Sequence, residues 1–365
     1  MITTAIFPGR YVQGYEAIRN LGFEAKRFGE IVFLICSPSA YQNLLPGFKP
    51  EAEKSVKVLA DQFGGECCDE EIERLSNLVK KANCHVVCGI GGGKTLDTAK
   101  AVAFNLKLPV IIAPSIASND APCSALSVIY SSNGAFNRYL ILPKNPDVVL
   151  VDTKIIAEAP VRFLIAGIGD ALSTWFEAES CKNKYALNMS GHVGAMTAYA
   201  LARLCFDTLL EYGAMARTAC EQHIVTPALE HIIEANILLS GLGFESAGLA
   251  AAHAIHNGLT VSPKTGRFLH GEKVAIGTLA SLFLTDKPTG IIDQVYLFCE
   301  SVGLPTTLGD IGLSGVSDAD LLEIAKRACG EGETIYNELV PISPEAVVRA
   351  LKAADIEGKK RKKLS

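Results

Sequence analysis

The sequence lacks the features that would place it in or across a membrane. No uncharged apolar run reaches about 18 residues, the length that a membrane-spanning helix requires. The first residues, MITTAIFPGRYVQG, do not combine a basic stretch with a following apolar one, so we expect no secretory signal. These two absences predict a protein without a membrane partner.

A basic surface for nucleic acid is also lacking. The formal net charge is −5, and the terminal run 359–363 (KKRKK) supplies five positive charges, so residues 1–358 carry −10. A nucleic-acid binder needs clustered cations to displace counterions from phosphate, so we expect no nucleic-acid partner. We expect the terminal run to be a solvated, frayed end.

A disulfide pattern is absent although cysteines are numerous. The chain has 11 cysteines, an odd number, and none forms a Cys-x-x-Cys pair. Most lie in apolar stretches, as in Leu204-Cys205-Phe206, where a free thiol acts as a small hydrophobic side chain. The pattern favours a reducing compartment and hence a cytoplasmic protein.

The composition predicts a folded chain of two domains. Hydrophobic residues make up 49% of 365 residues and charged residues 20%, enough for a large core. In residues 1–155, short apolar runs that contain no polar residue alternate with helical patterns. This alternation is typical of a doubly wound parallel sheet. The expected strands are 31–36, 85–90, 110–114 and 148–151, the expected helices 70–82 and 94–105, with a hairpin over 127–142 that turns at 132–134.

Residues 156–365 have a different pattern, because strand-like runs nearly vanish after Pro160. The spacing of apolar residues predicts an all-α domain. Its expected helices are 161–177, 188–212, 226–241, 244–257, 271–285, 289–301, 318–329 and 344–354. The fold class is therefore an α/β domain followed by an all-α domain.

A glycine-rich turn, Gly89-Ile90-Gly91-Gly92-Gly93-Lys94-Thr95, joins an expected strand to an expected helix. Backbone N–H groups and the positive end of a helix at such a turn favour phosphate. The spacing fits neither a Walker A loop, which would need glycine at Cys88, nor Gly-x-Gly-x-x-Gly, whose third glycine would fall on Lys94. A tight turn without a ligand is the alternative, and three consecutive glycines before Lys-Thr favour a nucleotide phosphate.

A second group of residues has the chemistry of a metal site. His253 and His256 are three residues apart, which places both rings on one face of a helix. His270 follows a short loop, and Asp170 lies in an apolar, small-residue helix where a carboxylate needs a partner. Two imidazoles and one carboxylate suit Zn²⁺ or Fe²⁺, although ordinary core histidines and a capping aspartate remain an equal alternative from spacing alone.

Five segments together carry a resemblance to a known family. They are GIGGGKTLDTAKAVA (89–103), PSIASNDAPCSALSVIY (114–130), GIGDALSTWFEAESC (167–181), GFESAGLAAAHAIHNGL (243–259) and FLHGEKVAIGTL (268–279). They resemble the glycerol dehydrogenases, a group within the metal-dependent "iron-containing" alcohol dehydrogenases, and the likeness extends from Tyr11 to Ile335. The resemblance implies a dehydroquinate synthase-like architecture and an NAD-dependent, metal-assisted oxidation of glycerol and related vicinal diols to dihydroxyacetone.

The resemblance also implies roles for individual residues. Asp170, His253 and His270 would hold Zn²⁺ (or Fe²⁺) and face the substrate, with Asp120 and His256 as catalytic residues. Asp120 would also bind the polyol, and the proton would leave through solvent past His256. NAD would be held by residues of the glycine turn and its surroundings: Ser37, Gly92, Gly93, Lys94, Ser115, Ser118, Ser124, Leu126 and Tyr130. The family implies a homo-oligomer, often an octamer.

Two positions depart from the family pattern. Ser37 stands where an aspartate usually binds the adenosine ribose, so repulsion of a 2′-phosphate is lost and the preference for NAD over NADP is weakened. Tyr336 stands where family members often have histidine.

Two classes of protein are the alternatives: an enzyme of the same fold that acts on a phosphorylated substrate, and a protein without catalytic activity. A polyol-phosphate dehydrogenase or a dehydroquinate-synthase-like lyase would surround the metal with cations, but only Lys273 and Arg267 lie near the expected ligands in sequence. A neutral substrate is therefore favoured. A non-catalytic NAD-binding or structural protein would have no use for a buried metal constellation.

Overall fold

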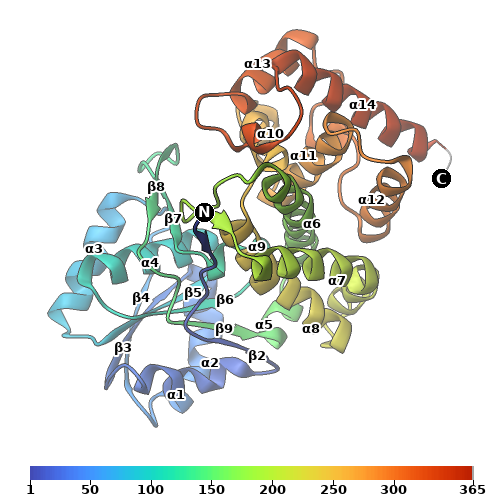
Figure 1. Cartoon of the computed structure of the whole chain (residues 1–365). Coiled ribbons are helices and arrows are strands. Elements are labelled where there is room, and N and C mark those ends of the chain that lie inside the picture. Colours follow the sequence, from blue (N-terminus) through green and yellow to red (C-terminus); the bar gives the residue numbers. More distant parts are fainter. Residues whose placement is uncertain (364–365) are drawn as a thin grey trace. The chain divides into compact units, whose positions relative to one another are not determined.

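The computed structural model describes residues 1–363 and divides into two compact units. The α/β unit comprises Ile6–Pro160 and Ala219–Gly241. The helical unit comprises Met1–Ala5, Val161–Thr218 and the chain from Leu242 onwards (Figure 1). Both the parallel sheet of the first unit and the helices of the second confirm the predicted fold class.

The α/β unit is built on a six-stranded sheet in which every pairing is parallel. The strand order is β2-β9-β6-β5-β3-β4. The strands are β2 (Tyr11–Gly14), β3 (Ile31–Cys36), β4 (Lys57–Gln62), β5 (Val86–Gly91), β6 (Val110–Pro114) and β9 (Val148–Asp152). The glycine-rich turn follows β5 and therefore lies at the carboxyl edge of the sheet, where doubly wound proteins bind ligands.

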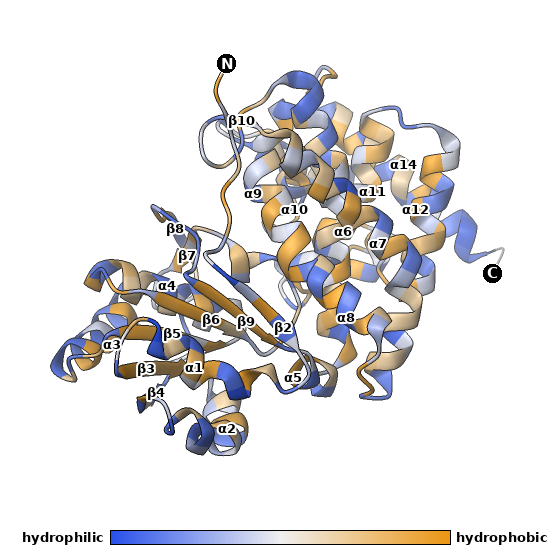
Figure 2. Cartoon of the chain, turned by 60° about the horizontal axis from the view of Figure 1, so that its bottom comes forward, coloured by the Kyte–Doolittle hydropathy of each residue, from blue (hydrophilic) through white to orange (hydrophobic). Residues whose placement is uncertain are grey.

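The central strands are apolar throughout because both faces of the sheet are buried (Figure 2). In β3, Val32 and Leu34 pack on one side while Phe33 and Ile35 pack on the other. The first side is covered by a 3₁₀ turn (Ala17–Asn20), α1 (Leu21–Lys26) and α2 (Leu45–Ala52), and the second by α3 (Asp69–Lys81) and α4 (Gly93–Leu106). The four predicted strands and two predicted helices of this unit are present within one or two residues of their expected ends.

The two outer strands of the sheet were not predicted. Strand β2 is only four residues long and half-buried, and β4 (KVLADQ) carries polar residues at both ends. An edge strand is exposed on one side, so its sequence does not show the continuous apolar run of a central strand. The predicted hairpin is confirmed as β7 (Leu126–Tyr130) and β8 (Phe136–Ile141), which pair antiparallel.

The helical unit is organised around one central helix, α11 (His270–Leu284), which packs against α6 (Val161–Lys184), α10 (Ala251–Leu259) and α14 (Pro344–Lys362). The remaining helices of at least eight residues that lie wholly or largely in this unit are α7 (Met196–Glu221), α9 (Ser240–Ala247), α12 (Thr289–Val302) and α13 (Asp318–Ala328). The unit is not purely helical, because β1 (Thr3–Thr4) pairs with β10 (Val193–Gly194).

The units differ from the predicted division into 1–155 and 156–365. The chain passes from one unit to the other after Pro160, because α5 (Thr153–Glu158) belongs with the α/β unit. Residues 219–241, including α8 (Pro227–Glu234), also belong to that unit. There the Asn236 amide donates to the carbonyl of Ala117 (3.2 Å). A helical periodicity reports one buried face and does not identify which unit buries it.

Five predicted helices have different bounds. The helix expected over 161–177 continues to Lys184, and the one expected over 226–241 continues through a π-helical turn into α9. The helix expected over 188–212 begins only at Met196, because residues 185–195 form a loop with β10. The helix expected over 244–257 is interrupted at Gly248, whose φ of 108° is left-handed. The helix expected to end at 354 continues to Lys362, where Arg361 pairs with Asp293 and Lys362 with Asp310 (2.5 Å). The expectation of a frayed basic end was therefore wrong for residues 359–362.

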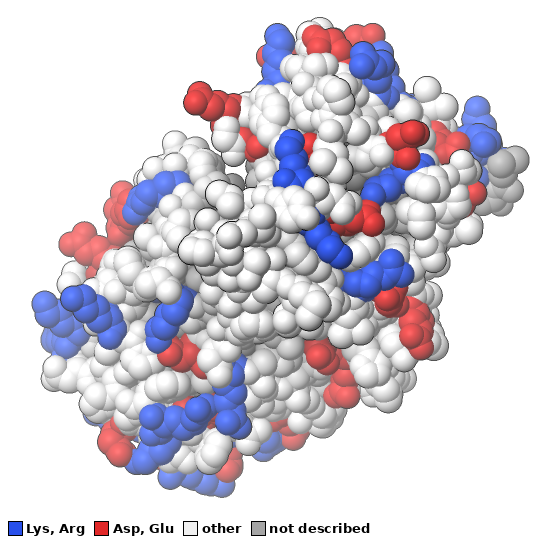
Figure 3. Space-filling model, viewed as in Figure 1, with Lys and Arg blue, Asp and Glu red and all other residues white. Residues whose placement is uncertain are grey.

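All eleven cysteines lie in the described part of the chain as free thiols, and ten of them are buried, which confirms their predicted role as small hydrophobic side chains. On the face drawn in Figure 3, basic and acidic side chains are interspersed. Among residues 1–363, no single helix is long and apolar enough to cross a membrane; one bent pair, Pro227–Ala247 with Ala251–Leu259, meets the length and composition test only when its members are joined.

Candidate active site

Close helix packing brings the predicted metal ligands of the helical unit together. Asp170 lies in the middle of α6, and His270 is the first residue of α11. A Cβ on Gly271 would lie 1.7 Å from the carbonyl oxygen of Ala166, and a Cβ on Gly169 would lie 2.5 Å from that of Gly271. The two glycines therefore let α6 and α11 approach at backbone contact distance beside the two ligands.

The side chains of Asp170, His253 and His270 form one cluster. Oδ1 of Asp170 lies 3.1 Å from Nε2 of His270 and 3.4 Å from Nε2 of His253. One ligand atom from each residue lies within 4.8 Å of the other two. The carboxylate is 1% exposed, whereas the two imidazoles are partly exposed. The donor set of one carboxylate oxygen and two imidazole nitrogens fits a Zn²⁺ or Fe²⁺ site with an open position.

The electrostatics of the cluster favour positive charge at its centre. Burial opposes the charged form of Asp170, but the imidazoles of His270 and His253 outweigh it and hold the pKa of the carboxyl well below its usual range. Burial likewise opposes charge on His253, yet Glu177 and Asp170 raise the pKa of this imidazole well above its usual value. The negative charges of Asp170 and Glu177 therefore favour a cation bound between these side chains.

His256 lies behind the cluster. Its Nε2 is 3.0 Å from Nδ1 of His270, and its Nδ1 is 3.2 Å from Oδ1 of Asn257. The Asn257 amide in turn donates to Glu333 (3.0 Å). Burial, together with the neighbouring His270 and Lys273, lowers the pKa of His256 well below its usual value. The ring is therefore neutral and holds His270 from the side opposite Asp170.

Glu177 is a residue of this cluster that the sequence analysis missed. Its Oε2 lies 2.6 Å from Nδ1 of His253. A sequence signal existed, because Glu177 follows Asp170 by seven residues, two turns along the same face of α6.

The glycine turn of the α/β unit is shaped for close approach. A Cβ on Gly91, whose φ is 157°, would lie 2.9 Å from the Cβ of Ser37. A Cβ on Gly92 would lie 3.2 Å from Ile116, and one on Gly93 would lie 3.5 Å from the Asn119 amide. The turn thus lies between the end of β3 and the loop after β6, with bare backbone at the start of α4.

Several predicted nucleotide-binding residues surround this turn. The backbone N–H of Ser115 donates to Gly91 (2.9 Å). The ammonium of Lys94 pairs with Glu66 (2.6 Å) and lies 4.8 Å from the ring centre of Tyr130. Ser118 is half-buried in the loop that follows β6.

Ser124 and Leu126 are engaged by a buried lysine that the sequence analysis also missed. Lys100, only 1% exposed, donates to the carbonyls of Ala121 (2.6 Å) and Leu126 (2.9 Å) and lies 3.3 Å from the hydroxyl of Ser124. It therefore fixes the segment 121–126 from within the unit.

Asp120 precedes that segment and is buried. Its Oδ2 accepts a hydrogen bond from the Ser240 hydroxyl (2.8 Å), and both residues belong to the α/β unit. Tyr336, by contrast, is half exposed, and its hydroxyl donates to the carbonyl of Cys329 (2.8 Å).

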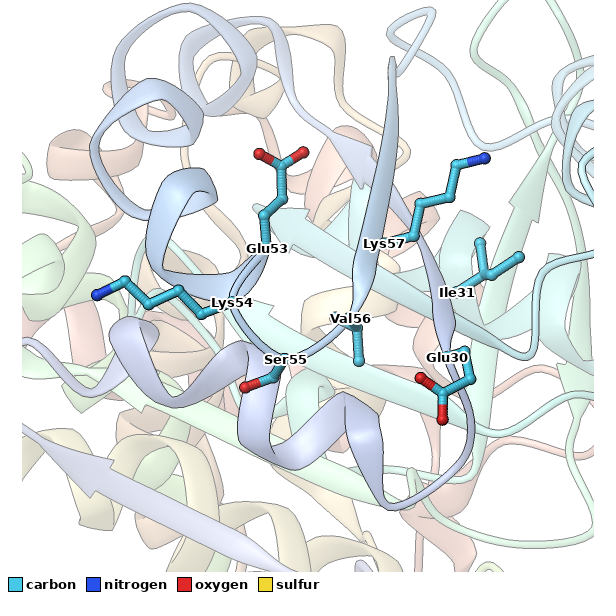
Figure 4. Close-up of a pocket in the computed structure, with 7 residues that line it drawn as sticks. All are labelled: Glu30, Ile31, Glu53, Lys54, Ser55, Val56 and Lys57. Atoms are coloured by element: carbon cyan, nitrogen blue, oxygen red, sulfur yellow. The ribbon is translucent and has the colours of Figure 1, made fainter.

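A surface hollow of the α/β unit lies away from the predicted site (Figure 4). It is formed at the amino ends of β3 and β4. Its lining residues are Glu30, Ile31, Glu53, Lys54, Ser55, Val56 and Lys57. The glycine turn lies at the opposite, carboxyl end of the strands, so this hollow has no part in the predicted nucleotide site.

The chain is similar in sequence and structure to known proteins. Residues 8–153 match the family model of iron-containing alcohol dehydrogenases. The chain is 65% identical, over the full length of both chains, to a glycerol dehydrogenase of Thermotoga maritima. It is 49% identical to that of Citrobacter freundii, covering 96% of each chain. The structure of the Schizosaccharomyces pombe glycerol dehydrogenase superposes with a TM-score of 0.95 at 37% identity, covering 98% of this chain and 92% of that one.

The chain belongs to the family of iron-containing alcohol dehydrogenases. It is therefore an oxidoreductase, and the resemblance to this family that the five sequence segments indicated is confirmed.

Proposed function

We propose that this chain is an NAD-dependent glycerol dehydrogenase that oxidises glycerol and related vicinal diols to dihydroxyacetone and its analogues. The observation that carries the proposal is the Asp170–His253–His270 cluster, whose donor atoms lie within 4.8 Å of one another. The relatives at 65% and 49% identity, both named glycerol dehydrogenases, support the substrate. A phosphorylated substrate is not favoured, because Lys273 is buried in α11 and Arg267 lies over the ring of Phe268.

Asp170, His253 and His270 would hold the metal, for which we propose Zn²⁺. The chemistry that a bound Zn²⁺ supplies is Lewis acidity, which makes a hydroxyl group more acidic near neutral pH. The buried carboxylate of Asp170 orients both imidazoles through their Nε2 atoms. His256 holds the other ring nitrogen of His270, and because both of its own nitrogens have partners, we assign it to positioning.

The backbone of Gly92, Gly93 and Lys94 would hold the pyrophosphate of NAD. When NAD is bound, its nicotinamide accepts the hydride. The start of α4 offers N–H groups and the positive end of a 14-residue helix. Ser37, Ser115, Ser118, Leu126 and Tyr130 would flank the rest of the nucleotide. Ser124 would contribute chiefly by shaping this segment, since its hydroxyl donates to Ala121 and lies beside Lys100.

Asp120 would bind a hydroxyl of the polyol. Ser240 donates to Oδ2 of this carboxylate, which fixes its orientation, and a carboxylate can accept hydrogen bonds from the hydroxyls of a diol. A neutral diol suits a single carboxylate acceptor better than a phosphate does. We further propose a homo-oligomer that works in the cytoplasm, where its eleven thiols stay reduced.

An alcohol panel tests the function. NADH formation is measured with glycerol, 1,2-propanediol, 2,3-butanediol and ethanol, before and after removal of metal by a chelator. We expect the vicinal diols to exceed ethanol, chelation to abolish turnover and Zn²⁺ to restore it. Equal rates with ethanol would contradict the substrate, and full activity after verified metal removal would contradict the metal centre.

A further inference from the structure

The amino end of α10, which carries His253, has no local side-chain cap. The residue before the helix is Ala250, and the backbone there is irregular, with Gly248 at a φ of 108°. Alanine has no acceptor for the first N–H groups of a helix, which must find partners elsewhere when they are buried.

Two buried carboxylates from distant segments supply those partners. Oε1 of Glu177 accepts from the N–H groups of Ala250 (2.9 Å) and His253 (3.0 Å). Oε1 of Glu338 accepts from the N–H of Ala251 (3.1 Å). Both glutamates are at most 3% exposed. They share one structural task, the capping of α10.

Glu177 contacts the His253 ring, which Glu338 does not; the second oxygen of Glu338 accepts from the Ser180 hydroxyl instead (2.5 Å). Oε2 of Glu177 lies 2.6 Å from Nδ1 of His253, while Nε2 of the same ring lies 3.4 Å from Asp170. A carboxylate accepts hydrogen bonds only, so Nδ1 must carry the proton, and in a neutral ring Nε2 then keeps its lone pair on the side of Asp170.

We propose that Glu177 is a positioning residue that fixes the tautomer and orientation of His253 and thereby sets the metal affinity of the site. The inference rests on the proposed function, because it requires the cluster to hold a metal. A carboxylate behind a ligating imidazole typically contributes 10–100-fold to metal affinity.

Glutamine at this position separates the two tasks of Glu177. Its amide has one acceptor oxygen, whereas Glu177 accepts on both oxygens. If that oxygen caps α10, the amide NH₂ faces Nδ1 of His253 and favours the tautomer whose Nε2 carries hydrogen. Such a ring has no lone pair for a metal at Nε2.

The test compares Glu177→Gln with Glu338→Gln, a control that alters the cap of the same helix without touching the ring. Metal-free full-length proteins are titrated with Zn²⁺ against a chromophoric chelator, and with Co²⁺ while its visible absorption is recorded. We expect Glu177→Gln to weaken Zn²⁺ binding by about 10–100-fold and to alter the Co²⁺ spectrum, and Glu338→Gln to stay within about threefold of wild type.

Equal losses of Zn²⁺ affinity in both variants would overturn the proposal, because they would show that Glu177 acts only as a cap of α10. So would Zn²⁺ binding by Glu177→Gln within about threefold of wild type. If Glu177→Gln does not fold, Glu177→Asp is tested instead, because it keeps the charge but shortens the side chain by one methylene. A Zn²⁺ affinity of Glu177→Asp equal to that of wild type overturns the proposal as well. Wild-type protein that takes up no Zn²⁺ would instead refute the metal centre itself.

Discussion

Gly271 touches Ala166 so closely that an added methyl group would lie 1.7 Å from the carbonyl oxygen of Ala166. The adjacent residue, His270, approaches Asp170 to 3.1 Å across the same helix contact. The position of a predicted metal ligand therefore depends on the absence of a side chain next to it.

Gly271→Ala should separate α6 from α11, because the oxygen that the methyl group meets is rigid backbone. We expect a loss of about 1–3 kcal/mol in the free energy of unfolding, together with weaker metal binding. Gly290→Ala is the control, since a Cβ there meets nothing within 4 Å and alanine suits a helix. Urea unfolding and Zn²⁺ titration of both variants measure the effect, and equal stabilities would show that the contact is tolerant.

Asp170→Asn should remove metal binding and turnover. The amide is nearly isosteric but uncharged, so it no longer balances the charge between two imidazoles. We expect turnover to fall by at least about 100-fold and NAD affinity to change little, since the glycine turn belongs to the other unit. Asp207→Asn, on the surface beside Arg203, is the matched control. Metal content and NADH formation report the result, and a variant that keeps both would remove Asp170 from the ligand set.

The sequence predicted those parts of the molecule whose structure is determined by residues close to one another in the chain. The central strand β5 shows its burial in its own apolar run, and His253 and His256 share a helix face by spacing alone. The outer strand β4 escaped prediction because its exposed edge admits Lys57 and Asp61.

The side chains missed at the site are buried charges whose partners lie far away in sequence. The spacing places Glu177 on the same face of α6 as Asp170, but it does not show that the carboxylate is buried; its burial follows from N–H groups more than 70 positions further along the chain. Lys100 is similar, because its carbonyl partners at 121 and 126 come from two other elements, a 3₁₀ turn (Ala121–Cys123) and β7. A charged residue is usually exposed, and only the assembled fold shows which ones find enough partners to be buried.

Ser37→Asp should increase discrimination against NADP. Ser37 directly follows β3 and lies beside Gly91 of the glycine turn, where a carboxylate would repel a 2′-phosphate and bind ribose hydroxyls instead. We expect wild type to accept both nucleotides and the variant to lose NADP affinity by roughly tenfold or more relative to NAD. Ser39→Asp, exposed two residues further on, adds the same charge as a control. Nucleotide binding followed by fluorescence quenching gives the ratio, and an identical shift in both variants would indicate a general charge effect.

Alkaline pH should destabilise the fold through its buried thiols. Burial raises the pKa of Cys36, Cys67 and Cys299 to about 12, against about 8.5 for an exposed thiol. Above about pH 8.5 the unfolded chain loses these protons while the folded chain keeps them, so the unfolded state binds fewer protons and stability falls as pH rises. Each thiol should lower the free energy of unfolding by about 2 kcal/mol at about pH 10 relative to neutral pH.

Urea unfolding between about pH 7.5 and 10, at constant protein concentration, measures this loss. Cys299→Ala should lower stability at neutral pH through its cavity, yet its stability should fall by about 2 kcal/mol less across the same range. Cys329→Ala is the control, because Cys329 is only partly buried and should change the slope less. A free energy of unfolding that stays level to about pH 10 in wild type would show that the thiols do not remain protonated in the folded chain.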